Sequence, residues 1–168
     1  MTTSTPALVQ HQSPTVLFVD DDLGIMQCVG MFLEQHEQLQ VLDYCTHAQA
    51  GVAAALEHKP DVVLLDVHMP GADAFWACRQ IVDRSHDRTK VLFYTSFPRD
   101  QYLDRCIAAG ASGMVSKHTE TIRGLALAIR YVLKGGSYYS PELAKRLCEL
   151  ESGAPRTRLA TLTHREIE

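Results

Sequence analysis

Four aspartates stand directly after apolar runs in this sequence. Asp20 to Asp22 follow residues 16–19, and Asp66 follows residues 62–65. Two carboxylates about 4 Å apart repel by roughly 1 kcal/mol in water and by about 4 kcal/mol at an effective dielectric constant of 20. Such a cluster therefore needs a proton or a cation. Mg²⁺ suits an all-oxygen ligand set, because it uses one or two carboxylates and leaves positions for water and phosphate.

A hydroxyl and an ammonium group stand after two later apolar runs. Thr95 follows residues 91–94, and Lys117 follows residues 113–116. The hydroxyl can donate a hydrogen bond, and the ammonium group can neutralise an anionic oxygen. Together with Mg²⁺, these groups suggest phosphoryl transfer to a carboxylate, and Asp66 is the expected acceptor. Taken singly, the residues have simpler interpretations, such as a helix cap or a solvated lysine. The set of four strand ends favours one shared site.

The apolar runs are predicted strands, because unbroken runs with β-branched members are typical of parallel strands buried on both faces. Helical periodicity follows each run. Five strand–helix pairs with right-handed crossovers predict an α/β fold with a doubly wound five-stranded parallel sheet. The carboxyl ends of its strands share one edge, where such sheets bind ligands. Strands are expected at 16–19, 39–45, 62–65, 91–94 and 113–116, and helices at 25–33, 47–58, 73–82, 102–110 and 122–133.

The two ends of the chain differ from its middle. Ser140 precedes a proline and caps a short predicted helix. Thr163 and Glu166 are spaced as a capping box, but the sequence ends within the first turn of that helix. Because an isolated turn is unstable, we expect the sequence to be part of a longer protein. The expected organisation is a disordered tail at 1–14, a domain at 15–136, a linker with a short helix at 137–160 and the start of another domain at 161–168.

Composition narrows the class of protein. The chain has 168 residues, 46% of them hydrophobic, and a net charge of −4, which does not support a broadly basic nucleic-acid-binding surface. Five scattered cysteines without a C-x-x-C pair predict buried thiols in a reducing compartment. There is no signal peptide and no apolar run approaching the roughly 20 residues of a membrane span. We therefore expect a cytoplasmic protein without membrane contact.

The strand-end motifs, in order, are FVDDD, DVVLLDVHMPGAD, VLFYTS and AAGASGMVSK. They resemble the signatures of two-component response regulator receiver domains, over residues 15 to about 134. The later strings AIRYVLKGGSYYSPELAKRL and LTHREIE resemble the junction of NarL/FixJ-type regulators, where a LuxR-type helix-turn-helix domain begins. This resemblance implies a flavodoxin-like (βα)5 receiver fold with a C-terminal linker helix.

The resemblance also implies a role for each residue of the predicted site and for the chain. A sensor histidine kinase or phosphotransfer protein would supply the phosphoryl group, and phosphorylation would favour a homodimer. DNA would be bound only through the domain that begins near residue 161. The protein would assist its own phosphorylation and dephosphorylation without turning over external substrates. Asp66 would be the phospho-acceptor. Mg²⁺ would be held by Asp20, Asp21, Asp66 and the backbone carbonyl of His68. Thr95 would be the switch hydroxyl, and Lys117 would contact the phosphoryl group.

Three positions depart from the family pattern. Ala74 stands where many relatives have Gly, and His118 stands where Pro or Asp is common. Met114 replaces the Tyr or Phe of the fifth strand, whose ring moves with the switch hydroxyl in relatives. An aromatic switch of the usual form is therefore not expected at this position, although methionine can repack.

Two other functions fit parts of the sequence. Asp20 and Asp22 form the D-x-D pattern of a haloacid-dehalogenase-like phosphatase, with nucleophile and acid/base in that order. Against it, Gly24 stands where that family prefers Thr or Val, and no second acidic pair follows Lys117. The chain could also be a phosphorylation-independent interaction module, which would function unchanged with Asp66→Asn.

Overall fold

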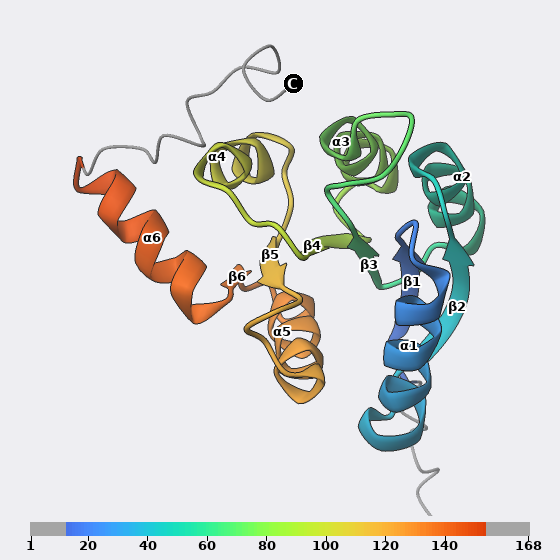
Figure 1. The fold of residues 1–168 in the computed structure, drawn as a ribbon. Helices are drawn as coiled ribbons and strands as arrows, with labels where there is room; N and C mark the ends of the chain where they lie inside the picture. Colours follow the sequence, from blue (N-terminus) through green and yellow to red (C-terminus); the bar gives the residue numbers. More distant parts are fainter. Residues whose placement is uncertain (1–12, 154–168) are drawn as a thin grey trace, which may run out of the picture.

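Strands and helices alternate along the chain in the computed structural model, which describes residues 13–153 (Figure 1). The predicted tail lies almost entirely outside the described residues, as do the end of the predicted linker and the predicted start of a second domain at 161–168. The strands are β1 (Thr15–Val19), β2 (Gln40–Cys45), β3 (Val62–Leu65), β4 (Lys90–Thr95), β5 (Gly113–Ser116) and β6 (Tyr138–Tyr139). The helices are α1 (Leu23–Glu37), α2 (Ala48–His58), α3 (Ala74–Ser85), α4 (Asp100–Ala108), α5 (Ile122–Leu133) and α6 (Pro141–Glu151).

The sheet is parallel throughout, with the strand order β2-β1-β3-β4-β5-β6. The prediction of five strands is wrong by one, because β6 adds a short sixth strand within the stretch expected to be linker. Gly113 pairs with Tyr138, and a Cβ on Gly113 would lie 1.7 Å from the Tyr138 carbonyl oxygen. Gly113 also has a φ of +147°, which favours glycine. The sixth strand therefore depends on a close backbone approach that a two-residue apolar pattern does not reveal.

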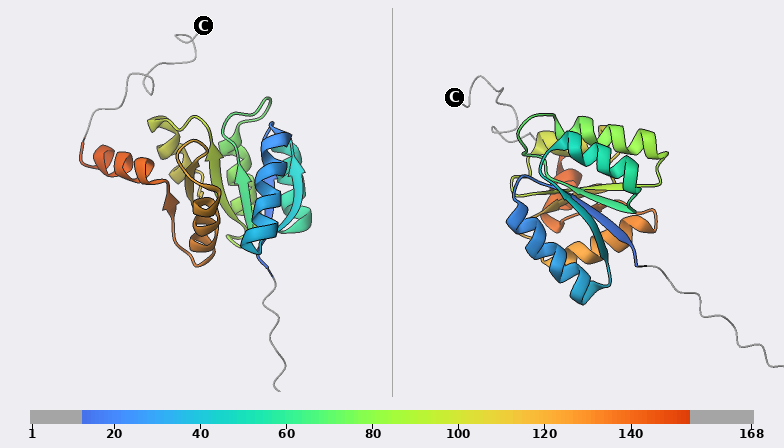
Figure 2. Two further views of the ribbon diagram at one scale, coloured as in Figure 1. Left: turned by 60° about the horizontal axis from the view of Figure 1, so that its bottom comes forward. Right: turned by 90° about the vertical axis from the view of Figure 1, so that its right-hand side faces the viewer.

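Helices cover both faces of the sheet, as predicted (Figure 2). Alternate strand residues point to opposite faces, so Leu17 and Val19 pack in one core cluster, whereas Val16 and Phe18 pack in the other. The first cluster includes residues of α2, α3 and α4, and the second includes residues of α1 and α5. Burial on both faces explains why these strands have unbroken apolar sequences.

The predicted helix after Ser140 is present as α6, beside α4 at the β6 edge (Figure 1). Leu143 is buried in the core cluster that contains α4 residues. Arg146 of α6 binds Asp100 of α4 through two hydrogen bonds, Nε to Oδ1 at 2.9 Å and Nη2 to Oδ2 at 2.7 Å. Planar two-point pairing of this kind fixes orientation as well as distance. The linker helix is therefore docked on the domain by both apolar and ionic contacts.

The cysteine prediction is correct for three residues. Cys45, Cys78 and Cys106 are buried free thiols, but Cys28 on α1 and Cys148 on α6 are exposed. Both exposed cysteines lie on the outer sides of helices, and scattered spacing does not distinguish these from core-facing positions. Among residues 13–153, no helix combines the length and apolar character that crossing a membrane requires.

Candidate functional site

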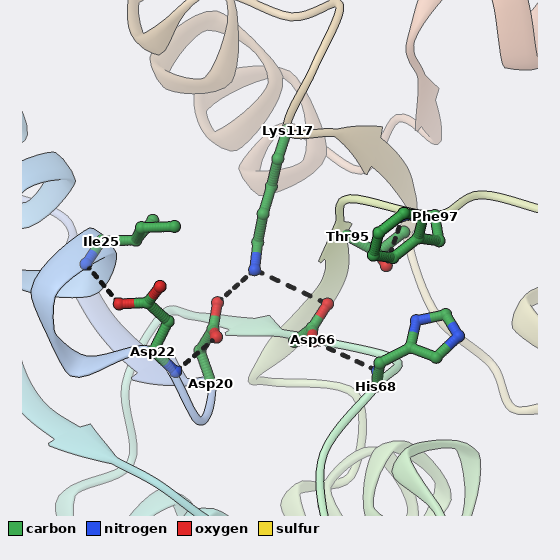
Figure 3. A network of polar contacts seen from close by, with 8 residues as sticks. All are labelled: Asp20, Asp22, Ile25, Asp66, His68, Thr95, Phe97 and Lys117. Atoms are coloured by element: carbon green, nitrogen blue, oxygen red, sulfur yellow. Dashed lines mark hydrogen bonds and ion pairs between the residues drawn. The ribbon is translucent and has the colours of Figure 1, made fainter.

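The carboxyl ends of four adjacent strands bring the predicted site residues together (Figure 3). Asp20 follows β1, Asp66 follows β3, Thr95 ends β4 and Lys117 follows β5. Backbone hydrogen bonds continue the ladder past the strand ends, since the Asp66 N–H donates to the Val19 carbonyl at 2.8 Å. The four side chains therefore share one edge of the sheet, as the parallel strands predicted.

Three carboxylates at this edge form an all-oxygen cluster. One ligand atom from each of Asp20, Asp21 and Asp66 lies within 4.8 Å of the others. Asp20 and Asp66 are buried, with 4% and 6% of their surface exposed, whereas Asp21 is exposed. The His68 N–H donates to Asp66 Oδ2 at 3.2 Å, so this loop's backbone lies against the carboxylate. That the His68 carbonyl is a metal ligand stays a prediction.

Lys117 supplies the positive charge of the cluster. Its ammonium group forms an ion pair with Asp20 and lies 3.6 Å from Asp66 Oδ1. Only 9% of the lysine side chain is exposed, so water screens these interactions weakly. The Lys117 N–H also donates to the Thr95 carbonyl at 2.9 Å, which ties the lysine to the end of β4. The ammonium group therefore balances part of the acidic charge.

Asp66 has an oxygen atom with unused bonding capacity. Its Oδ1 is buried and accepts no hydrogen bond from the described residues. Burial raises the pKa of Asp66, with Lys117 opposing the rise and Asp20 adding to it; Thr95 and Val67 lower the pKa more weakly. A buried acceptor without a donor costs stability. This atom can therefore bind a hard cation or attack an electrophile, and the cluster fits Mg²⁺ by its donor types.

Thr95 is fully buried beside this carboxylate. Its hydroxyl oxygen accepts the Phe97 N–H at 3.4 Å, a long contact that leaves the hydroxyl proton available to another acceptor. Phe97 is itself exposed, and its ring meets the edge of the His68 ring at 5.7 Å between centroids. The Thr95 hydroxyl therefore contacts the loop after β4 through Phe97, and that loop contacts the loop after β3 through His68.

The structure adds a contact of the His68 ring that the sequence did not indicate. His68 was expected to act through its backbone, but Nε2 also lies 3.1 Å from the Tyr102 hydroxyl on α4. The two residues are 34 positions apart, so no local spacing could reveal this pairing. Met114, which stands where relatives have Tyr or Phe, is fully buried in the core. Tyr102 is thus an aromatic side chain that connects the site loops with α4.

Asp22 does not take the place that a phosphatase mechanism would require. Its Oδ1 accepts the Ile25 N–H at 3.0 Å and caps α1, while its own N–H donates to Asp20 Oδ1 at 3.0 Å (Figure 3). A carboxylate used as a helix cap is held at the helix start. This geometry disfavours Asp22 as a general acid/base beside an Asp20 nucleophile.

Asp66→Asn is expected to raise the unfolding free energy of the Mg²⁺-free protein by about 1–2 kcal/mol, because it removes a buried, incompletely paired charge. The folded-state pKa of Asp66 is raised, so the folded protein keeps this proton to higher pH than the unfolded chain does. The wild type should therefore lose stability relative to the variant as pH rises from 3.8, the ordinary value, toward the raised value. Urea unfolding in EDTA across this range measures the difference. A variant no more stable than wild type at neutral pH would contradict the electrostatic account.

Comparisons with known proteins agree with this architecture. The sequence model described as the response regulator receiver domain matches residues 16–129. Response regulator GacA of Pseudomonas viridiflava is 35% identical over 156 residues, which cover 91% of this chain and 72% of GacA. Transcriptional regulatory protein DesR of Bacillus subtilis is 29% identical over 133 residues, covering 79% of this chain and 65% of DesR.

Solved structures show the same fold. A LuxR-family two-component response regulator from an Aurantimonas species has a TM-score of 0.77 at 24% identity, covering 83% of this chain and 99% of that one. A CheY-like receiver domain protein from Methanospirillum hungatei has a TM-score of 0.66 at 22% identity, covering 73% and 95%. These likenesses establish the flavodoxin-like α/β fold. The family match and the similarity to GacA extend over most of the chain, which therefore belongs to the response regulator receiver domain family, with response regulators such as GacA among its relatives.

Proposed function

We propose that Asp66 accepts a phosphoryl group from the phosphohistidine of a sensor histidine kinase or of a phosphotransfer protein. The observation that carries this proposal is the buried Asp66 Oδ1, which accepts no hydrogen bond from the described residues and faces the Lys117 ammonium group at 3.6 Å. A carboxylate oxygen in this state is a nucleophile with a cation beside the position of the incoming charge.

The transfer replaces one bond to phosphorus by another. An Asp66 oxygen attacks phosphorus and forms the O–P bond, while the P–N bond of the phosphohistidine breaks. The leaving imidazole keeps the electron pair of that bond and takes a proton from water. Lys117 leaves its position between the two aspartates and contacts a phosphoryl oxygen, and the Thr95 hydroxyl donates to another.

Asp20, Asp21, Asp66 and the His68 carbonyl would hold Mg²⁺ at this edge. The bound ion supplies positive charge that offsets the repulsion between the carboxylates and the phosphoryl oxygens. With Mg²⁺ bound, Asp20 would be a metal ligand, and Lys117, now its ion-pair partner, would be available to the phosphoryl group. The acidic cluster and the ion-paired lysine beside it together support this assignment.

Removal of Mg²⁺ tests the proposal. With acetyl phosphate as donor, we expect EDTA to lower the rate of phosphorylation by about 10²-fold or more, since the acceptor would then face an anionic donor with only Lys117 as counter-charge. The rate is measured by phosphate-affinity gel electrophoresis, and Ca²⁺ at the same ionic strength is the control. Equal rates in EDTA and in Mg²⁺ would show that phosphorylation does not require Mg²⁺.

Phosphorylation is further proposed to change the surface formed by α4, β5 and α5. The new phosphoryl oxygens would draw Thr95 and Lys117 inward, and the loops that follow β4 and β5 would move with them. Tyr102, hydrogen-bonded to His68, gives α4 a direct contact with the site. These contacts support a change in that surface, and we propose a symmetric homodimer, the commonest type of oligomer, as its output.

Sedimentation with beryllofluoride, which stands for the phosphoryl group, measures this change. We expect a shift from monomer toward dimer in Mg²⁺ with beryllofluoride, and no shift with either component alone. Asp66→Asn is the control, because it lacks the oxygen that beryllofluoride binds. Identical association of the wild type in both states would show that the output is not self-association.

Relatives named as transcriptional regulatory proteins support a role in transcription. We propose that the receiver controls the DNA-binding activity of an attached output domain, for which residues 161–168 resemble the start. DNA would be read by the recognition helix of that domain rather than by this receiver. A phosphorylation-independent role would be favoured only if Asp66→Asn left the activity of the full-length regulator unchanged.

A further inference from the structure

The loop that carries Lys117 is hydrogen-bonded to a segment from beyond the family match. We call residues 116–120 the lysine loop and residues 138–142, which span β6 and the start of α6, the brace. The family match ends at residue 129, so the brace lies outside it. Three side-chain hydrogen bonds join the two segments, which makes the brace a part of the site's surroundings rather than a passive linker.

Ser140 makes the innermost of these contacts. It is fully buried, and its Oγ accepts the backbone N–H of Ser116 at 3.0 Å. Its own N–H donates to the Met114 carbonyl at 3.1 Å, so both contacts hold the last part of β5. Ser116 directly precedes Lys117. A buried N–H group that lost this acceptor would have no water to replace it, and the loop would shift to find another partner.

The outer contacts hold the rest of the lysine loop. The Tyr138 hydroxyl donates to Glu120 Oε2 at 2.8 Å, and the Thr119 hydroxyl donates to Glu142 Oε1. Burial, with Glu120 adding to it, raises the pKa of Tyr138 to about 12, so the donor keeps its proton at neutral pH. The Glu120 N–H donates to the Ser116 carbonyl at 3.1 Å, so the lysine loop is also closed by a backbone hydrogen bond.

The lysine is therefore held from two sides. Its N–H bonds to the Thr95 carbonyl on β4, and the preceding residue bonds to Ser140 of the brace. Four methylene groups separate the backbone of Lys117 from its ammonium group, so a small rotation of the loop moves that group relative to Asp66. Outer partners that orient a reacting group typically change activity by roughly 10–100-fold when they are removed.

We propose that the brace positions Lys117 for phosphoryl transfer, with Ser140 as the principal positioning residue. The proposal rests on the function proposed above. It also makes the start of α6 sensitive to phosphorylation, because movement of Lys117 toward a phosphoryl group strains the same contacts. Such coupling is reciprocal: a partner that displaces α6 would weaken binding of the phosphoryl group.

The test uses the full 168-residue chain with Ser140→Ala and, as a second variant, Tyr138→Phe, which removes only an outer hydroxyl. We expect Ser140→Ala to weaken beryllofluoride binding and to lower the second-order rate constant of phosphorylation by acetyl phosphate, each by roughly tenfold. Tyr138→Phe should lower both by about twofold to threefold. The Mg²⁺ dissociation constant should stay within about twofold of wild type for both, since the carboxylates are untouched.

Two control variants separate positioning from loss of stability. Ser137→Ala changes an exposed serine directly before the brace and should behave as wild type. Val29→Ala removes buried side-chain volume from α1, on the other face of the sheet from α6, and it measures the effect of lost stability alone. Wild-type beryllofluoride affinity in both Ser140→Ala and Tyr138→Phe, or equal losses in Ser140→Ala and Val29→Ala, would overturn the proposal. A wild type that binds no beryllofluoride would instead refute the proposed function.

Discussion

Lys117→Gln is expected to lower the unfolding free energy of the Mg²⁺-free protein by about 3 kcal/mol. The lysine is the cation of a buried group with two carboxylates, and its removal leaves both without a counter-charge. The cost is limited because one carboxylate can take up a proton instead of remaining charged. Mg²⁺ should restore part of the lost stability, since the ion takes over the neutralising role.

Urea unfolding of the wild type and of Lys117→Gln, each in EDTA and in Mg²⁺, measures this effect. Lys134→Gln is the matched control, because that lysine is exposed at the end of α5 and should change stability by less than about 0.5 kcal/mol. A Lys117→Gln variant as stable as the control in EDTA would show that the ion pair with Asp20 contributes no net stability. Phosphorylation of this variant should also slow by about 10²-fold, because the charge beside the transferred group is lost.

Much of the site followed from the sequence because parallel strands place their carboxyl ends at one edge. Asp66 could be located from its apolar run alone. The helix expected at 73–82 is present as α3, and Asp73 caps it by accepting the Phe75 N–H on Oδ1 at 3.0 Å. These inferences depend on local patterns and on the handedness of crossovers. They need no knowledge of which side chains finally meet.

Contacts between distant residues could not be predicted in the same way. Lys117 and Asp20 are 97 positions apart, and their ion pair depends on β1 and β5 lying in one sheet with β3 and β4 between them. The brace was missed for a similar reason, since Ser140 looked only like a helix cap. Its side chain in fact accepts the Ser116 N–H, and no capping hydrogen bond to α6 is made. Local pattern predicted its helix but not its partner.

Asp66→Asn is expected to abolish phosphorylation by acetyl phosphate and by a cognate histidine kinase. The amide cannot attack phosphorus, and the neighbouring Asp20 is already engaged by Lys117 and by the Asp22 N–H. The variant should nevertheless be folded, because asparagine has nearly the same shape and removes an unfavourable buried charge. Asp83→Asn on the outer side of α3 is the control, since this carboxylate is exposed and should leave the phosphorylation rate unchanged.

The most direct test of the account is the intact mass of wild type and of Asp66→Asn after incubation with acetyl phosphate and Mg²⁺. Wild type should gain the mass of one phosphoryl group, sensitive to hydroxylamine as an acyl phosphate is, and should gain none in EDTA. Asp66→Asn should keep its starting mass. A phosphoryl group on Asp66→Asn at the wild-type rate, or an unmodified wild type under conditions that phosphorylate another receiver, would contradict Asp66 as the acceptor.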